Sequence, residues 1–213
     1  GGEVEACGNA ARCIADRLIL GADTSQLSIN TLGGRLRAWR RPDGVIAVDM
    51  GRARFGWADI PLALAVDDTD AVGGVAAAEE AGIGAGSVVN VGNPHIVYWV
   101  DDPAAVDLGR IGPLIEHDPL FPQRVNVNVA TVVDRKTLRL RVWERGVGLT
   151  RACGTGACAT AVAAMRRGLV DREVSVELPG GPLSIAWHQD NRIIMTGPAT
   201  QAFRGSFELD DYT

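Results

Sequence analysis

The sequence contains two Cys-Gly dipeptides, and their cysteines are the side chains best suited to catalysis. Cys7 and Cys153 are each followed by glycine, and small or apolar residues that predict a helix come next. The unpaired backbone N–H groups of a helix's first turn, with the helix dipole, lower the pKa of a thiol and can also bind a carboxylate. We therefore expect Cys7 and Cys153 to be reactive thiols at the amino ends of two helices.

The second of these helices should be buried. No residue from Ala157 to Met165 carries a charge, so a helix there has no face suited to water. Arg166 and Arg167 suit the carboxyl end of the helix dipole, and Gly168 suits the left-handed residue that follows.

Residues 7–21 line up with residues 153–168, which indicates an internal duplication. Each copy has Cys-Gly at its amino end, small residues in the first turn and a closing glycine, Gly21 or Gly168. Two thiols presented in this way suggest a pair that faces one another across a shared cleft. One could remove a proton from a carbon centre while the other supplies one on the opposite face.

Three motifs, at residues 5–13, 92–95 and 144–158, closely resemble those of the diaminopimelate epimerase family. The resemblance runs over essentially the whole chain. It implies an α+β fold of two pseudo-symmetric domains, each a strand barrel wrapped round a central helix. The N-terminal domain would comprise residues 1–52 plus 199–213, and the C-terminal domain residues 53–198. Family members begin roughly 65 residues earlier, so upstream sequence is expected to be missing.

The resemblance further implies an isomerase that interconverts LL- and meso-diaminopimelate, for lysine and peptidoglycan synthesis, without pyridoxal phosphate. Cys7 and Cys153 would be the catalytic base and acid, exchanging roles with the direction of reaction. The expected substrate-binding residues are Gly8, Asn9, Asn93, Asn126, Glu144, Arg145, Gly154 and Thr155.

Local patterns bear on several of these polar residues. Pro94 holds Asn93 extended at a strand junction, and Asn126 and Asn128 share one face of a strand. Glu144 and Arg145 end a strand and suit an ammonium and a carboxylate group, respectively. His95 is a further candidate, equally consistent with a ligand contact and with a hydrogen-bonded core histidine.

Two alternatives remain. A proline racemase or hydroxyproline epimerase would share the two-cysteine fold, but a histidine commonly follows Cys-Gly there and this chain has Asn9. A fold-sharing binding protein would need one reactive thiol or none. Ala6 and Ala10 depart from the family's usual methionine and glycine beside Cys7, which are small changes.

No cofactor or metal is expected. The only lysine, Lys136, lies in a charged turn that suits a Schiff base poorly, and no dinucleotide or Walker fingerprint is present. The cysteine spacings are wide for zinc. Cys13 and Cys158 are expected to be buried small hydrophobes.

Composition points to small-molecule chemistry. The 213 residues carry a net charge of −5 with scattered basic residues, which gives no support for nucleic-acid binding. The longest stretch without charge, Ala81 to Val100, contains asparagine, proline and glycine and is no membrane span. A reducing cytoplasm suits an enzyme with two reactive thiols, and the expected assembly is a homodimer.

Alternating apolar residues and turn residues predict the remaining elements. Short helices are expected near 76–81 and 107–116, and a linker at 51–61. Strands are expected near 27–31, 36–40, 45–50, 63–66, 87–91, 96–100, 125–133, 137–143, 174–178, 183–187 and 193–196.

Overall fold

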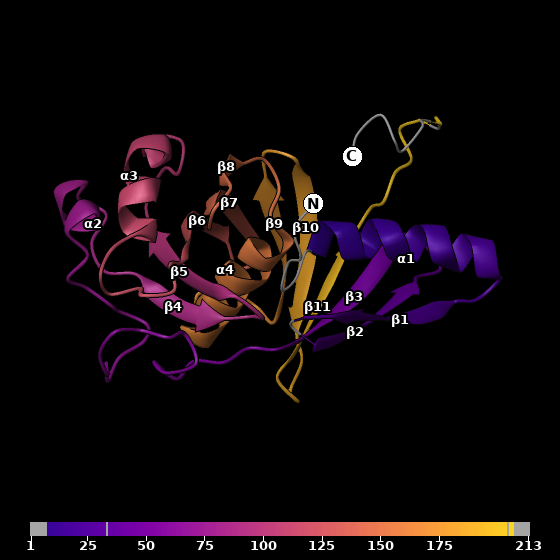
Figure 1. Cartoon of the computed structure of the whole chain (residues 1–213), viewed down its shortest axis with the longest axis horizontal. Coiled ribbons are helices and arrows are strands. Elements are labelled where there is room, and N and C mark those ends of the chain that lie inside the picture. The colour runs from indigo at the N-terminus through magenta and orange to yellow at the C-terminus, as the bar shows by residue number, and fades with distance from the viewer. Residues whose placement is uncertain (1–7, 33, 204, 207–213) are drawn as a thin grey trace.

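The computed structural model describes residues 8–32, 34–203 and 205–206. Helices and strands alternate irregularly along the chain, in an α+β arrangement that confirms the predicted fold class (Figure 1). The helices are α1 (Gly8–Ala22), α2 (Ala76–Glu80), α3 (Leu108–Glu116) and α4 (Gly154–Arg166). The strands are β1 (Gln26–Thr31), β2 (Gly34–Arg40), β3 (Ile46–Arg52), β4 (Ser87–Asn90), β5 (Pro94–Trp99), β6 (Asn126–Asp134), β7 (Thr137–Glu144), β8 (Gly148–Thr150), β9 (Glu173–Leu178), β10 (Gly181–Trp187) and β11 (Arg192–Gly197).

All these strands belong to one mixed sheet. Its order is β1-β2-β3-β11-β10-β9-β7-β6-β5-β4, with β8 paired to β7 off this path. The pairs β5–β6 and β7–β9 are parallel and the others are antiparallel. The antiparallel pair of β11 with β3 joins the first strands of the chain to the last ones.

Helix α4 is the centre of the larger core. Every residue from Gly154 to Met165 is buried, as the uncharged stretch predicts, and Gly168 has the left-handed φ of 69° that ends the helix. Strands β4 to β7 and β9 to β11 all contact α4, so the sheet wraps round it. This packing explains why a helix with no polar face is stable here.

A second core lies on the other side of β4, β5 and β6. Helix α3 packs against β6, β7 and β8, and α2 packs against α3. The main side chains of this core include Ile96, Tyr98, Ile111 and Ile115. Because apolar groups cover both faces, β4 is buried at all its positions and does not alternate. The strands that carry the polar residues of interest are therefore held from two sides.

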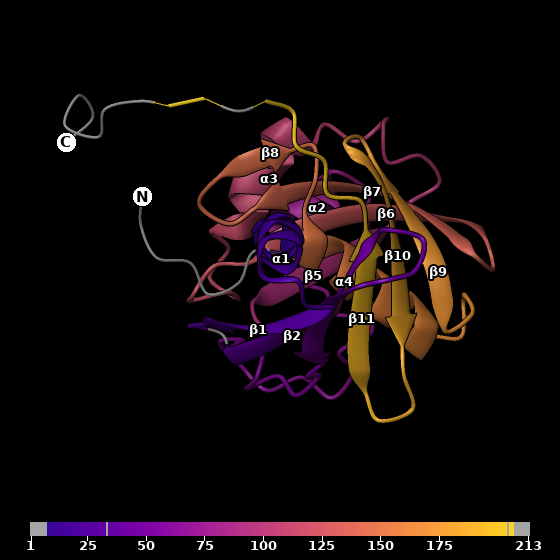
Figure 2. The ribbon, with the colours of Figure 1, turned by 90° about the vertical axis from the view of Figure 1, so that its right-hand side faces the viewer.

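Helix α1 lies along β1, β2 and β3 (Figures 1 and 2). It is at the opposite end of the molecule from α2 and α3 (Figure 1). Ala11, Ala15 and Ile19 face those strands. The other side of α1 is exposed at Ile14 and Leu18. Cys13 lies on this side, so the prediction that it is buried is wrong, whereas Cys158 on α4 is buried as predicted.

The predicted helices and strands are confirmed except at three places. Residues 63–66 form a loop, with Leu64 56% exposed, because a short apolar run does not by itself distinguish a strand. Strand β8 was not predicted, since it is three residues long. Helix α1 continues through Gly21, and the left-handed residue after it is Asp23, with φ 47°.

Candidate active site

Helices α1 and α4 meet at their amino ends. A Cβ atom on Gly154 would lie 3.1 Å from the Cα atom of Gly8, and one on Gly8 would lie 3.3 Å from the Cα atom of Gly154. Met195 of β11 packs against both positions. Such a close backbone approach needs two residues without side chains. The glycines that follow Cys7 and Cys153 in the sequence are therefore in direct contact.

Cys153 is the residue before α4 and caps it. Its backbone is extended, and its Sγ atom accepts a hydrogen bond from the N–H of Gly156 at 3.3 Å. The hydroxyl of Thr155 lies 3.5 Å from the same sulfur. Cys7 lies outside the described residues.

The protonation state of Cys153 differs from the prediction. Burial, reinforced by the negative charge of Glu144, raises the pKa of this thiol to about 12. The hydrogen bonds from Thr155 and Gly156 lower the pKa but do not compensate, because the thiolate is almost completely removed from water. In this state Cys153 is a thiol and hence a proton donor.

A chain of hydrogen bonds leads from β6 to this thiol. The Nδ2 atom of Asn128 lies 3.0 Å from Nδ1 of His95, and Nε2 of His95 lies 3.0 Å from Oδ1 of Asn93. Since an amide nitrogen can only donate, Nδ1 of His95 accepts and its proton is on Nε2. Asn93 in turn donates to Oγ1 of Thr155 at 3.4 Å.

His95 is fully buried, and burial lowers its pKa to about 3, so the ring is neutral. Both of its nitrogen atoms are engaged by asparagine side chains. This is the geometry of a hydrogen-bonded core histidine that orients Asn93.

Asn9 and Asn126 make hydrogen bonds to the backbone around the site. Asn9, in the first turn of α1, donates to the carbonyl of Ala152 at 3.0 Å, which links α1 to the residue before Cys153. Asn126 donates to the carbonyl of Pro94 at 2.8 Å and accepts from the N–H of Arg145 at 3.0 Å.

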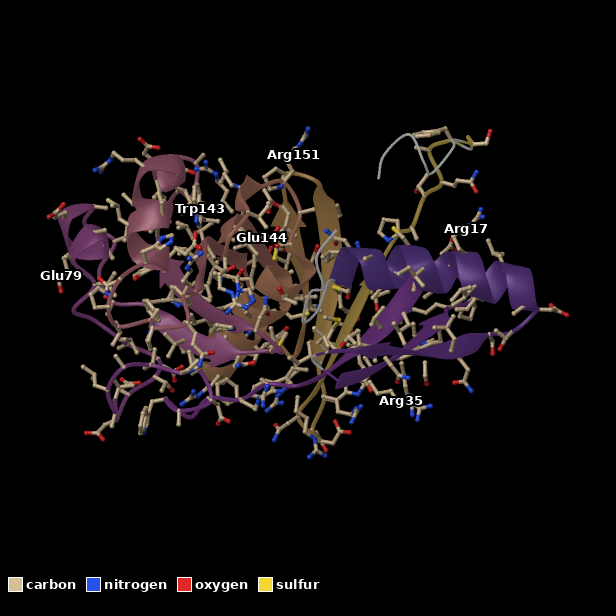
Figure 3. The ribbon with its side chains drawn as sticks, viewed as in Figure 1. Arg17, Arg35, Glu79, Trp143, Glu144 and Arg151 are labelled. Carbon is tan, nitrogen blue, oxygen red and sulfur yellow. The ribbon has the colours of Figure 1, made fainter. Side chains whose placement is uncertain are left out.

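Glu144 and Arg145 lie at the tip of the β7–β8 hairpin. Figure 3 shows Glu144 toward the middle of the molecule, unlike the peripheral Arg17 and Arg35. Its carboxylate accepts a hydrogen bond from Thr150 at 2.5 Å and is close enough to Cys153 to raise the pKa of that thiol. The guanidinium of Arg145 donates to the carbonyl of Gln123 at 3.0 Å.

The structure thus brings together the described residues that the sequence singled out: Gly8, Asn9, Asn93, His95, Asn126, Glu144, Arg145, Cys153, Gly154 and Thr155. Sequence reasoning missed Thr150, which holds Glu144, and the role of Asn128 in holding His95. The alternation along β6 places Asn128 on the same face as Asn126 and was the available signal. Within the described ranges no group of three or more His, Cys, Asp or Glu is arranged to hold a metal ion.

Comparison with known proteins assigns the family. Residues 87–202 match the family model described as diaminopimelate epimerase. The chain is 54% identical over 213 residues to a diaminopimelate epimerase of Erythrobacter litoralis, covering 100% of this chain and 75% of that protein. The chain belongs to the diaminopimelate epimerase family.

Another diaminopimelate epimerase, from Rhizorhabdus wittichii, is 55% identical over 212 residues, which cover 100% of this chain and 73% of that protein. The chain therefore spans about three quarters of the length of these relatives. Among solved structures, a probable proline racemase from Agrobacterium radiobacter has a TM-score of 0.64 at 15% identity, over 98% of this chain and 69% of that one. At that identity the likeness concerns the fold alone.

Proposed function

We propose that this member of the diaminopimelate epimerase family interconverts LL- and meso-diaminopimelate by a two-base mechanism. The protein is an isomerase, and Cys7 and Cys153 are its catalytic pair. The observation that supports this most is the contact of Gly8 with Gly154, since each glycine directly follows one of the two cysteines.

The reaction needs one thiolate and one thiol. The thiolate takes the α-proton of the substrate from one face, and the thiol delivers its own proton to the carbanion from the other face. The enzyme ends with thiol and thiolate exchanged. In the state described, the raised pKa of Cys153 makes it the donor, so Cys7 would be the base for that direction.

The amino ends of α1 and α4 also favour the negative charge that develops on the substrate during the reaction. The N–H groups of the first turns of α1 and α4, at Gly8, Asn9, Gly154 and Thr155, would receive the α-carboxylate and stabilise the carbanion. Asn93, Asn126, Glu144 and Arg145 would hold the rest of the substrate. No cofactor takes part in this scheme.

The same proposal includes the division into domains 1–52 plus 199–213 and 53–198, a homodimer, and a cytoplasmic location. A reducing compartment would keep two neighbouring thiols from oxidising. Among the described residues, none of the helices has the length and apolar character needed to cross a membrane.

The deciding experiment measures exchange of the α-proton in D₂O with the full-length protein. With diaminopimelate as substrate, deuterium should enter the α position and the LL and meso forms should equilibrate. Exchange with proline or hydroxyproline in place of diaminopimelate would favour the racemase alternative. Absence of exchange, together with fewer than two fast-alkylating thiols, would favour a binding protein.

A further inference from the structure

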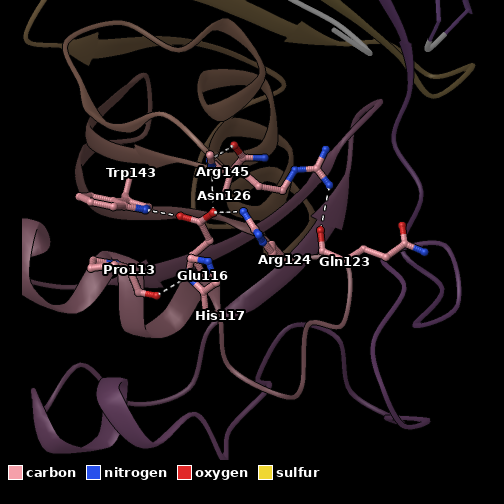
Figure 4. A network of polar contacts seen from close by, with 9 residues as sticks. Pro113, Glu116, His117, Gln123, Arg124, Asn126, Trp143 and Arg145 are labelled. Carbon is pink, nitrogen blue, oxygen red and sulfur yellow. Dashed lines mark hydrogen bonds and ion pairs between the residues drawn. The ribbon is translucent and has the colours of Figure 1, made fainter. Parts of the chain in front are cut away.

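The buried carboxylate of Glu116 is outside the site proposed above, yet it is bonded to the hairpin that carries two substrate-binding residues. Glu116 is the last residue of α3 and is 2% exposed. Its Oε2 atom accepts a hydrogen bond from the indole N–H of Trp143 at 2.7 Å. Its Oε1 atom accepts one from the backbone N–H of Gly146 at 2.9 Å. Figure 4 shows this network.

This position is unfavourable for a carboxylate unless it has such partners. Burial penalises the charge, and the carboxyl end of a helix carries partial negative charge of its own. The guanidinium of Arg124 is 3.8 Å away and half-exposed, so it compensates weakly. The two N–H donors are therefore what makes the carboxylate stable, and the carboxylate in turn holds both donors in place.

The two donors flank Glu144 and Arg145 in the chain. Trp143 precedes them in β7, and Gly146, with the left-handed φ of 73°, follows them in the turn. Fixing residues 143 and 146 at one carboxylate restricts the two residues between them. The N–H of Arg145 is fixed independently by Asn126.

The two faces of β7 explain how Glu116 acts at a distance. Trp143 faces α3, where a Cβ on Gly112 would lie 2.6 Å from the indole ring. Val142 faces α4, since its side chain is 3.0 Å from where a Cβ on Gly156 would be. Side chains alternate along a strand, so Glu144 shares the face of Val142 and points toward the thiol side.

We propose that Glu116 is a positioning residue for the epimerase reaction, holding the β7–β8 turn so that Glu144 and Arg145 meet the substrate. This rests on the proposed function, because it takes Glu144 and Arg145 as substrate contacts. It assigns to Glu116 a role that acts through its hydrogen bonds to Trp143 and Gly146.

The test uses Glu116→Gln in the full-length protein. A carboxamide has one accepting oxygen, so it loses one of the two bonds and turns an N–H₂ group toward the other donor. We take Glu144 and Arg145 to bind the ground state and the transition state alike, so KM for diaminopimelate should rise about tenfold with kcat little changed. Trp143→Phe removes one donor, retains the Gly146 bond and should raise KM by a smaller factor.

Adding Trp143→Phe to Glu116→Gln should lower KM again, because the carboxamide oxygen can then accept from Gly146 without its N–H₂ group facing the indole N–H. The matched control is Ser87→Ala. Ser87 is buried on β4 and accepts the indole N–H of Trp99 at 3.2 Å, away from the hairpin. The Ser87→Ala variant should lower the melting temperature, as Glu116→Gln does, and leave KM for diaminopimelate unchanged.

An unchanged KM in Glu116→Gln would overturn the proposal, as would an equal rise in KM in Ser87→Ala, which would attribute the effect to lost stability. If Glu116→Gln does not fold, Trp143→Phe decides: a folded variant with wild-type KM refutes the role. A wild-type protein that fails to exchange the α-proton of diaminopimelate refutes the proposed function instead, so the two failures are distinguishable.

Discussion

Replacing Gly154 by alanine tests the contact between the two helix ends directly. The new Cβ atom would lie 3.1 Å from the Cα atom of Gly8 and 3.0 Å from Sδ of Met195. Carbon atoms in good contact are about 3.5–4.0 Å apart. The methionine can move, but the Gly8 backbone belongs to α1, so the two helices must separate by about half an ångström.

The cost follows from this overlap. Forcing an extra methyl group into a packed interior costs about 1–3 kcal/mol, and alanine returns up to about 1 kcal/mol through its higher helix propensity. We expect a net loss of about 1–2 kcal/mol in the free energy of unfolding. For a domain of this size that lowers the melting temperature by about 2–8 °C.

Gly21→Ala is the matched control, because Gly21 also lies in a helix and a Cβ there meets nothing within 4 Å. It should raise the melting temperature by about 2–4 °C. Gly8→Ala should cost less than Gly154→Ala, since its nearest obstacle, at 2.8 Å, is the flexible end of Met195.

The rate of α-proton exchange should also fall in Gly154→Ala, by about tenfold or more, because small displacements of reacting groups are costly. Thermal melts and α-proton exchange in D₂O measure the two effects. A Gly154→Ala protein with wild-type melting temperature and exchange rate would show that the helix ends do not meet as described.

Four further outcomes are expected. Alanine at Cys7 or at Cys153 should abolish epimerisation and leave the fold intact by circular dichroism, since each thiol serves one face of the carbon; near-normal turnover in either variant would contradict the two-base model. Air-oxidised protein should be inactive through a Cys7–Cys153 disulfide and recover with dithiothreitol, and peptide mapping that finds a Cys13–Cys158 bridge, or none, would count against this. Dialysed protein in EDTA should keep its activity, and restoration of lost activity by zinc or pyridoxal phosphate would overturn the cofactor-free scheme. Burial lowers the pKa of His95 from 6.5 to about 3, so the unfolded chain takes up the proton first as pH falls. As pH falls from 6.5 to about 3, His95 should therefore decrease the free energy of unfolding by about 1.4 kcal/mol per pH unit. In His95→Gln, the free energy of unfolding measured by urea denaturation should lack this contribution to its pH dependence.

Local patterns in the sequence predicted most of the elements, and the resemblance to the diaminopimelate epimerase family indicated which residues gather at the site. The uncharged stretch before Arg166 specified a helix with no face for water, and alternation specified strands such as β9 and β10. The repeated Cys-Gly step pointed to two equivalent helix ends. These signals are readable because periodicity and end residues act within a few positions of one another.

Tertiary structure alone decided how the site's groups are held and charged. The bonds of Asn128 to His95 and of Glu116 to Gly146 join residues about 30 positions apart, and the contact of Gly8 with Gly154 spans still more. The helix end by itself predicted a lowered pKa for Cys153, but burial beside Glu144 raises it. Desolvation and charge depend on which distant segments cover a group, and no local pattern of residues contains that information.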